Sequence, residues 1–335
     1  MQRHFLIATA LVFMLSSCNW FKSHTDTPPK AETPEVPLAK VPAFNPDSAY
    51  AYTLTQVDFG PRTPNSAAHD RCAAWMIKQL KQWADTVYVQ TYTATAFDGK
   101  EIKSKNIIAS FNPHTNARVF LSSHWDTRPI ADEDTRDQDK PIDGANDGAA
   151  STAMLLELAR AIRTQKTNIG VDLILFDSED YGQPATSPSP HSEDSWCLGS
   201  QYWAKAPHVP NYRADFGINL DMVASADAIF TREGISVQYA DWVSQYVWNI
   251  ASRLGYSTLF QSRVLGPITD DHYYVNVIRN IPTIDVIHYT ETGFGKYHHT
   301  HADNMTLISR EMIQTVGKVM LQTVYQYDAD KQHSS

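Results

Sequence analysis

Four short segments place residue types that bind metals directly after apolar stretches. They are Ser-His-Trp-Asp at 123–126, Gly-Ala-Asn-Asp-Gly at 144–148, Phe-Asp-Ser-Glu-Asp at 176–180 and His-Thr-His-Ala-Asp at 299–303. Imidazole and carboxylate groups are the zinc ligands that proteins use when a coordination position must stay open for chemistry. The recurrence therefore indicates a zinc-dependent hydrolase or acyl-transfer enzyme.

The apolar pattern predicts the elements that bring these segments together. Runs typical of strands occur at 87–92, 106–111, 118–122, 171–176, 216–220 and 283–287. Amphipathic stretches typical of helices occur at 65–84, 149–163, 199–206, 237–254 and 309–327. Buried strands that alternate with such helices predict an α/β fold, a three-layer sandwich in which helices cover both faces of a mostly parallel, twisted central sheet.

Polar side chains follow several of the predicted strands directly. His124, the pair Glu179 and Asp180, and Asp221 each stand just beyond the end of a strand. In sheets of this kind, ligands bind beyond the carboxyl ends of the strands. We therefore expect these side chains to meet at one edge of the sheet.

Each group also has a purely structural interpretation. Asp147 follows a glycine and precedes a helix, as helix-capping residues do. Glu179 and Asp180 alone would fit an exposed acidic loop, although neighbouring side chains in extended backbone point to opposite sides, so one can bind metal while the other faces a substrate. His299 lies in a histidine-rich run that could be surface, and a charge such as Asp221 at the rim of a buried strand usually needs a partner.

The first residues of the chain are typical of an export signal. A basic start and a short apolar run at 5–15 lead to Leu-Ser-Ser followed by Cys18. This pattern predicts a lipoprotein signal peptide at 1–17 and a lipid on Cys18, hence an exported bacterial lipoprotein that faces the periplasm or lies in the outer membrane. The alternative is an ordinary signal peptide that is cut nearby. Residues 18–45 read as a flexible linker, and 46–330 as a single zinc-dependent catalytic domain.

Composition narrows the class of partner. Asp and Glu outnumber Lys and Arg by 37 to 28, which argues against a nucleic-acid groove. Cys72 and Cys197 remain after Cys18, and both lie in apolar, helix-like contexts. Two separate buried thiols are therefore favoured over one disulfide. A monomer is expected.

In sequence order, the pattern His-x-Asp, Gly-x-x-Asp, Glu-Asp, Asp and His-Thr-x-x-Asp resembles the co-catalytic zinc aminopeptidase family over nearly the whole folded region. Within that family, five segments are similar to the glutaminyl cyclases of the animal-like type found in bacteria. They are 56–62, 66–69, 144–149, 196–200 and 270–272.

This resemblance implies roles for particular residues. One zinc would be held by Asp147, Asp180 and His299, and Glu179 would act as general base and acid. Asp221 and Asp270 match acidic residues that hydrogen-bond with that glutamate and with the substrate amide.

The resemblance also implies three substrate-binding positions. Trp196 matches a wall of the substrate pocket, although the loop 183–195 differs from the family in length and composition. Animal enzymes have a histidine where this chain has Asp285, and a tryptophan where it has His298. These substitutions affect the details of the pocket rather than the metal.

The implied reaction converts an N-terminal glutamine of a peptide or protein to pyroglutamate and releases ammonia. The open zinc position would take the γ-carbonyl oxygen while the α-amine attacks. Glu179 would carry a proton from the amine to the departing nitrogen, and repulsion from Asp221 and Asp270 would raise its proton affinity.

Two other functions remain as alternatives. An aminopeptidase on the same scaffold is one, because His124 and Asp221 are residue types that would complete a second zinc site. Asp180 argues against it, since peptidases of this family commonly have a glutamate there. A lipid-anchored binding protein without activity is the other. Only the cyclase would release free ammonia.

Overall fold

The computed structural model describes residues 37–190 and 192–333. The described chain from Leu38 onward forms one compact unit. The predicted signal peptide and the predicted lipid attachment at Cys18 lie outside the described residues.

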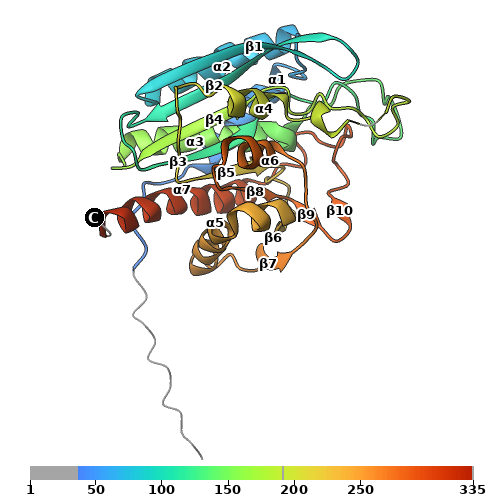
Figure 1. Ribbon diagram of the computed structural model, residues 1–335. Coiled ribbons are helices and arrows are strands. Elements are labelled where there is room, and N and C mark those ends of the chain that lie inside the picture. The colour runs from blue at the N-terminus through green and yellow to red at the C-terminus, as the bar shows by residue number, and fades with distance from the viewer. Residues whose placement is uncertain (1–36, 191, 334–335) are drawn as a thin grey trace, which may run out of the picture. The chain divides into compact units, whose positions relative to one another are not determined.

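A six-stranded sheet forms the centre of the molecule, in the order β1-β2-β4-β3-β5-β8 (Figure 1). Its strands are β1 (Thr86–Thr95), β2 (Glu101–Phe111), β3 (Arg118–His124), β4 (Gly170–Phe176), β5 (Phe216–Asp221) and β8 (Thr283–Ile287). β4, β3, β5 and β8 run parallel to one another, whereas β2 pairs with both β4 and β1 in the antiparallel sense. The mostly parallel sheet predicted from the sequence is confirmed.

Helices cover both faces of this sheet (Figure 1). They are α1 (Pro46–Asp58), α2 (Ala67–Trp83), α3 (Ser151–Thr164), α4 (Leu198–Lys205), α5 (Gly234–Arg253), α6 (Asp271–Tyr274) and α7 (Arg310–His333). Shorter elements are η1 (Ala145–Ala150), η2 (Glu193–Ser195), η3 (Val275–Arg279), β6 (Phe230–Arg232), β7 (Phe260–Val264), β9 (Tyr289–Thr290) and β10 (Gly293–Phe294). The three-layer α/β sandwich is therefore as predicted.

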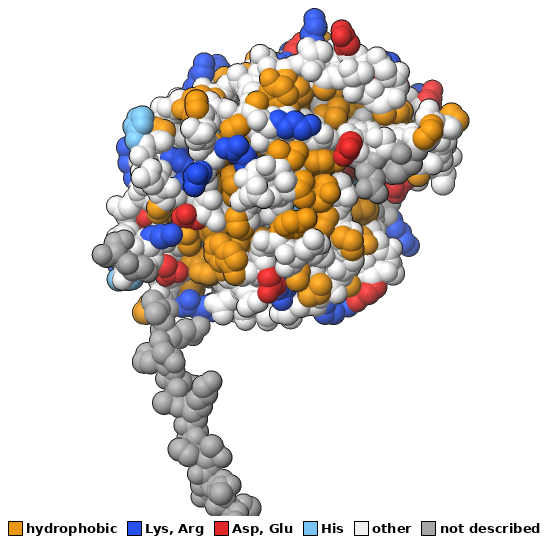
Figure 2. All heavy atoms as spheres, viewed as in Figure 1, with side chains coloured by type: hydrophobic (Ala, Val, Ile, Leu, Met, Phe, Trp, Pro, Cys, Tyr) orange, Lys and Arg blue, Asp and Glu red, His pale blue; other side chains and the backbone are white. Residues whose placement is uncertain are grey.

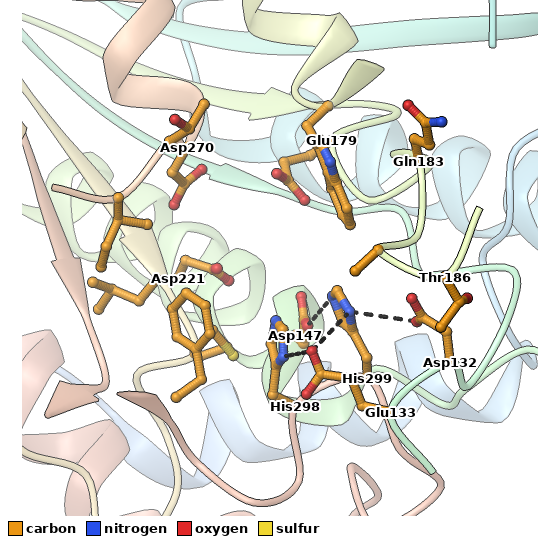
Figure 3. Close-up of a pocket in the computed structure, with 17 residues that line it drawn as sticks. Asp132, Glu133, Asp147, Glu179, Gln183, Thr186, Asp221, Asp270, His298 and His299 are labelled. Atoms are coloured by element: carbon orange, nitrogen blue, oxygen red, sulfur yellow. Dashed lines mark ion pairs between the residues drawn. The ribbon is translucent and has the colours of Figure 1, made fainter. Parts of the chain in front are cut away.

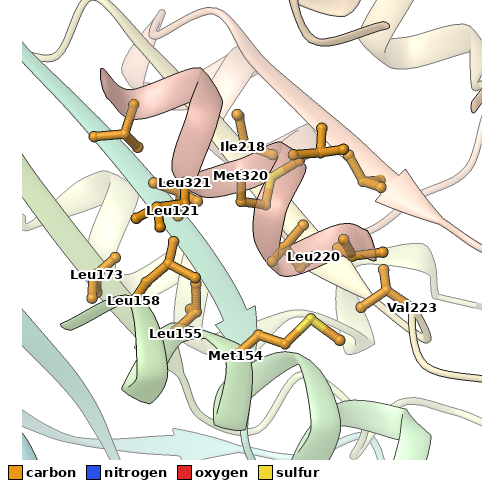
Figure 4. Packing of buried hydrophobic residues seen from close by; sticks show 14 of the residues in the cluster. Leu121, Met154, Leu155, Leu158, Leu173, Ile218, Leu220, Val223, Met320 and Leu321 are labelled. Carbon is orange, nitrogen blue, oxygen red and sulfur yellow. The ribbon is translucent and has the colours of Figure 1, made fainter. Parts of the chain in front are cut away.

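Alternate residues of the central strands supply two separate cores. In β3, Leu121 belongs to the cluster under α3 and α7, whereas its neighbour Phe120 packs with Trp203 of α4 on the opposite face. Figure 4 shows the first cluster, where Met154 and Leu155 of α3 approach the strands. Because successive side chains of a strand point to opposite faces, a continuous apolar run can serve both layers.

Helix α1 was not predicted from the sequence. Asn45 caps it by accepting hydrogen bonds from the backbone N–H groups of Asp47 and Ser48, and Pro46 occupies the first turn. Its buried face includes the polar residues Thr53 and Gln56, so the apolar spacing that marks the other helices is missing. Regular secondary structure therefore begins with α1 at Pro46, directly after the predicted linker at 18–45.

The surface mixes apolar, polar and charged side chains, with hydrophobic groups gathered over the middle of the face in Figure 2. Of the helices in the described part of the chain, none combines the length and the apolar character needed to cross a membrane. Cys72 and Cys197 are free and buried, in agreement with the expectation of two separate thiols.

Replacing Leu121 with alanine should destabilise the fold by about 2–5 kcal/mol, because the side chain is fully buried in β3 and its loss leaves a cavity in the core cluster under α3 and α7. Leu54→Ala is the control, since Leu54 is 40% exposed and its truncation should change the free energy of unfolding by less than about 0.5 kcal/mol. Urea titration followed by circular dichroism measures both. Equal effects of the two substitutions would contradict the assignment of the core.

Candidate metal and catalytic site

A cavity of about 530 Å³ opens beyond the carboxyl ends of the central strands. Asp221 from the end of β5 and Glu179 from the segment after β4 lie at its walls with Asp270, which precedes α6 (Figure 3). Asp147 from η1 and His299 from the loop before α7 reach the same cavity. The strand-end convergence predicted from the sequence is therefore present in the structure.

Asp147, Asp180 and His299 form one compact group of buried ligand atoms. The His299 Nε2 atom lies 3.2 Å from Asp180 Oδ1 and 4.0 Å from Asp147 Oδ2. Ligands of a tetrahedral zinc ion are about 3.4 Å apart at normal bond lengths. Both carboxylate oxygens of Asp180 are buried, and no hydrogen bond is made to them within the described residues. The donor set and its spacing fit a divalent cation.

Backbone contacts hold two of these ligands in place. The Asp303 carboxylate accepts hydrogen bonds from the N–H groups of Asn146, at 2.7 Å, and Asp147, at 3.1 Å. The Asp126 carboxylate does the same for the N–H groups of Glu179, at 3.1 Å, and Asp180, at 3.3 Å. Neither clamp was predicted, although both aspartates end motifs that the sequence singled out, His-x-Asp and His-Thr-x-x-Asp.

The electrostatics of the group favour a bound cation. Burial raises the pKa of Asp180 well above its usual range, and the nearby Asp147 carboxylate raises it further. Burial lowers the pKa of His299, as do the positive charges of His298 and Arg128, so its imidazole is neutral and can donate a lone pair. A cation between the two carboxylates would remove their mutual repulsion.

A second buried group adjoins the first. The His124 Nε2 atom lies 2.8 Å from Asp147 Oδ1 and 3.1 Å from Asp221 Oδ1. Although burial lowers the pKa of His124, Asp221, Asp126 and Asp147 together raise it well above its usual value. These three side chains, His124, Asp147 and Asp221, are also close enough to hold a metal.

Glu179 is partly exposed at the cavity while its carboxyl group is surrounded by other acids. Shielding from solvent raises the pKa of Glu179, and the charges of Asp270 and Asp180 add to this rise. Burial also raises the pKa of Asp221 to about 7, with a further contribution from Asp147. Asp270 accepts a hydrogen bond from Asn219 Nδ2 at 3.1 Å. Glu179 and Asp221 thus lie in an environment that favours proton uptake, and Asp270 lies beside them in the cavity wall.

Two of the three predicted substrate-binding residues line the cavity. The indole of Trp196 stacks on His299 with 5.7 Å between ring centroids, and the Arg128 guanidinium lies 4.5 Å above the Trp196 ring. Gly182 permits this packing, since a Cβ atom there would lie 1.8 Å from the indole. His298 stacks on Phe294 and lies 3.0 Å from the Glu133 carboxylate.

Asp285 was predicted to contact the substrate, but it does not line the cavity. It lies in the middle of β8, opposite Asn219 of β5, and is fully buried. The Asn219 amide donates to Asp285 Oδ1 at 3.4 Å, so this carboxyl lies behind Asp270 rather than at the cavity wall. Sequence position alone could not distinguish a rim residue from one beneath it.

Sequence reasoning also missed much of the cavity wall. The additional lining residues are Asp132, Glu133, Gln183, Ala185, Thr186, Met222, Ile268, Thr269, Ile287 and Phe294. Most come from loops that carry no periodic pattern or motif. Only tertiary packing brings them to the cavity.

Comparisons with known proteins agree with this geometry. Residues 106–324 match the profile of peptidase family M28. The glutaminyl-peptide cyclotransferase of Gloydius blomhoffii is 27% identical over 251 residues, which cover 66% of this chain and 65% of that protein. The chain thus spans just under two thirds of the length of that curated relative.

Two crystal structures have the same fold. A glutaminyl cyclase of Tannerella forsythia is 48% identical, with a TM-score of 0.82, over 85% of this chain and 99% of that one. A Zn-dependent exopeptidase of Parabacteroides distasonis is 47% identical, with a TM-score of 0.83, over the same shares. The resemblance inferred from the sequence motifs is confirmed, and the chain belongs to peptidase family M28.

Proposed function

We propose that this protein is a zinc-dependent glutaminyl-peptide cyclotransferase. It converts the N-terminal glutamine of peptides and proteins to pyroglutamate and releases ammonia. The observation that carries the proposal is a cavity in which Glu179 faces the buried group Asp147, Asp180 and His299. Similarity to the cyclases of Gloydius blomhoffii and Tannerella forsythia supports it.

One zinc per chain, held by Asp147, Asp180 and His299, is part of this proposal. Polarisation of the glutamine γ-carbonyl is the chemistry that zinc supplies when it is bound. Two carboxylates and one imidazole leave a tetrahedral position free for that oxygen. The carboxylates of Asp126 and Asp303 keep the ligand loops in place through backbone hydrogen bonds.

Glu179 moves the proton that the reaction requires. As the α-nitrogen of the substrate bonds to its γ-carbonyl carbon, that nitrogen passes a proton to the Glu179 carboxylate. The same proton then goes to the side-chain amide nitrogen, whose bond to carbon breaks, and ammonia leaves. The charge of Asp270 raises the pKa of both Glu179 and Asp221, and the carboxylates of Asp221 and Asp270 can accept hydrogen bonds from the substrate amide.

The walls of the cavity orient the substrate. Trp196 offers a flat apolar surface that stacks on the His299 ring. His298 also stacks on the His299 ring. Together they suit a small uncharged side chain such as glutamine, whose amide must reach both Glu179 and the ligand group.

An aminopeptidase is the second candidate. His124, Asp147 and Asp221 form another group close enough to hold a metal, and one similar structure is a Zn-dependent exopeptidase. Incubation with a Gln-initiated peptide separates the two functions. If the protein is a cyclotransferase, the peptide loses the mass of one ammonia and free ammonia appears. Release of free glutamine instead would establish the peptidase.

We also propose that the protein is exported and held at a bacterial membrane by a lipid on Cys18, facing the periplasm or in the outer membrane, as a monomer. Cys18→Ser should give soluble or unprocessed protein with unchanged activity, because the catalytic residues all lie beyond residue 45. Membrane fractionation and mass spectrometry of the N-terminal peptide check this. An N-terminal peptide without lipid in the wild-type protein would refute the anchor.

His299→Ala should remove most of the bound zinc and at least about 10²-fold of the activity, because one of three ligands is lost. His301→Ala is the control, since its Nε2 atom contacts the backbone oxygen of Asp137 rather than the ligand group. Metal analysis of both purified variants provides the measurement. Zinc retained by His299→Ala, or lost equally from both variants, would move the ligand role to another residue.

Glu179→Gln should retain zinc and fold, while cyclisation slows by about 10²–10⁴-fold, because the amide cannot carry the proton. Asp180→Asn, one residue further on, should lose zinc first, since its buried carboxylate faces His299. Atomic absorption and ammonia release distinguish the two variants. The roles would be wrong if both lost zinc equally, or if Glu179→Gln released ammonia at a near-normal rate.

A further inference from the structure

We propose that Cys197 is a positioning residue for Glu179, and that its thiol donates a hydrogen bond which holds the carboxylate in the orientation needed for proton transfer. The proposal rests on the proposed function in one respect, the role of Glu179 as the proton carrier. Nothing in the sequence motifs assigned a task to this cysteine.

The contact between the two side chains is direct. The Cys197 Sγ atom lies 3.1 Å from Glu179 Oε1. In addition, the ligand atoms of Glu179, Cys197 and Asp270 all lie within 4.8 Å of one another. A thiol is a weak donor, but the bond is stronger when the Glu179 carboxyl is ionised, which is the form that takes a proton from the substrate.

Backbone hydrogen bonds fix the relative position of the same two residues. The N–H of Cys197 donates to the carbonyl oxygen of Glu179 at 2.9 Å, and the N–H of Leu198 donates to that of Ser178 at 3.1 Å. Cys197 and Glu179 are therefore joined by a backbone hydrogen bond as well as by the side-chain contact. The thiol has little freedom to turn away from the carboxylate.

The backbone at Cys197 has an uncommon conformation for a residue with a side chain. Its φ and ψ are 56° and 35°, in the left-handed region, where it forms the N-cap of α4. Glycine is the residue that usually occupies this region. The side chain at this position points at the Glu179 carboxyl group, as a positioning role requires.

Burial places the thiol on the protein side of Glu179. Glu179 lines the cavity, whereas Cys197 does not line it and is 0% exposed. Burial, followed by the charge of Glu179, raises the pKa of the thiol well above its usual range, so it remains an S–H donor. The carboxylate can thus be held from behind without blocking the substrate.

Cys72 provides a matched control for the loss of a buried thiol. It is also 0% exposed, but it packs in the core under α2, and no hydrogen bond of its thiol occurs within residues 37–190 and 192–333. Its replacement should affect stability without affecting proton transfer.

The experiment compares four variants: Cys197→Ala, Cys197→Ser, Cys72→Ala and Cys72→Ser. Cys197→Ala should lower kcat about five- to tenfold relative to Cys72→Ala, with KM changed less than about twofold and zinc content unchanged. Cys197→Ser keeps a donor on the same left-handed backbone and should recover kcat to within about threefold of wild type. Rescue by serine is a result that a packing role would not produce.

Three outcomes would overturn the proposal. They are equal kcat losses in Cys197→Ala and Cys197→Ser, no loss in Cys197→Ala beyond that of Cys72→Ala, and a change confined to KM. Failure of the proposed function is a separate result, since the wild-type protein would then release glutamine rather than ammonia. In that case the same four variants are compared by their rate of peptide hydrolysis, where Glu179 would again be the base.

Discussion

Two buried carboxylates, Asp147 and Asp180, are the constraint on which the rest of the site depends. Removing such groups from water is unfavourable unless a counter-charge compensates, and both oxygens of Asp180 have no hydrogen-bond partner in the described part of the chain. His124 pairs with Asp147, and the Arg128 guanidinium lies 3.8 Å from Asp180 Oδ1, so these groups supply part of the counter-charge. His299 reaches both carboxylates as a neutral imidazole. A cation resolves the conflict, and the fold provides the place for one at the carboxyl edge of the sheet.

The local backbone points the adjacent side chains of Glu179 and Asp180 toward different partners. Ser178 adopts a left-handed conformation, with φ of 60°, which turns the chain sharply after β4. Asp126 then fixes the N–H groups of both acids, so that Asp180 meets His299 while Glu179 faces the cavity and Cys197. Neighbouring positions in the chain can therefore hold the metal and carry the proton separately.

Much of this arrangement could be predicted from the sequence. Continuous apolar runs marked the central strands, and the polar residues that follow them, such as His124 and Asp221, converge because parallel strands end at the same edge. Three other features could not be predicted from local sequence patterns. Helix α1 buries polar residues, the clamp by Asp303 joins positions 157 residues apart, and Asp285 differs from a rim residue only in its depth along β8.

His124 is the residue that most separates a single-metal cyclase from a two-metal peptidase on this fold. It lies between Asp147 and Asp221, within ion-pair distance of both. Anomalous diffraction at the zinc edge, from crystals of the active protein grown with excess zinc, tests this most directly. One peak is expected, bonded to Asp147, Asp180 and His299. A second peak of similar height between His124, Asp147 and Asp221 would contradict it.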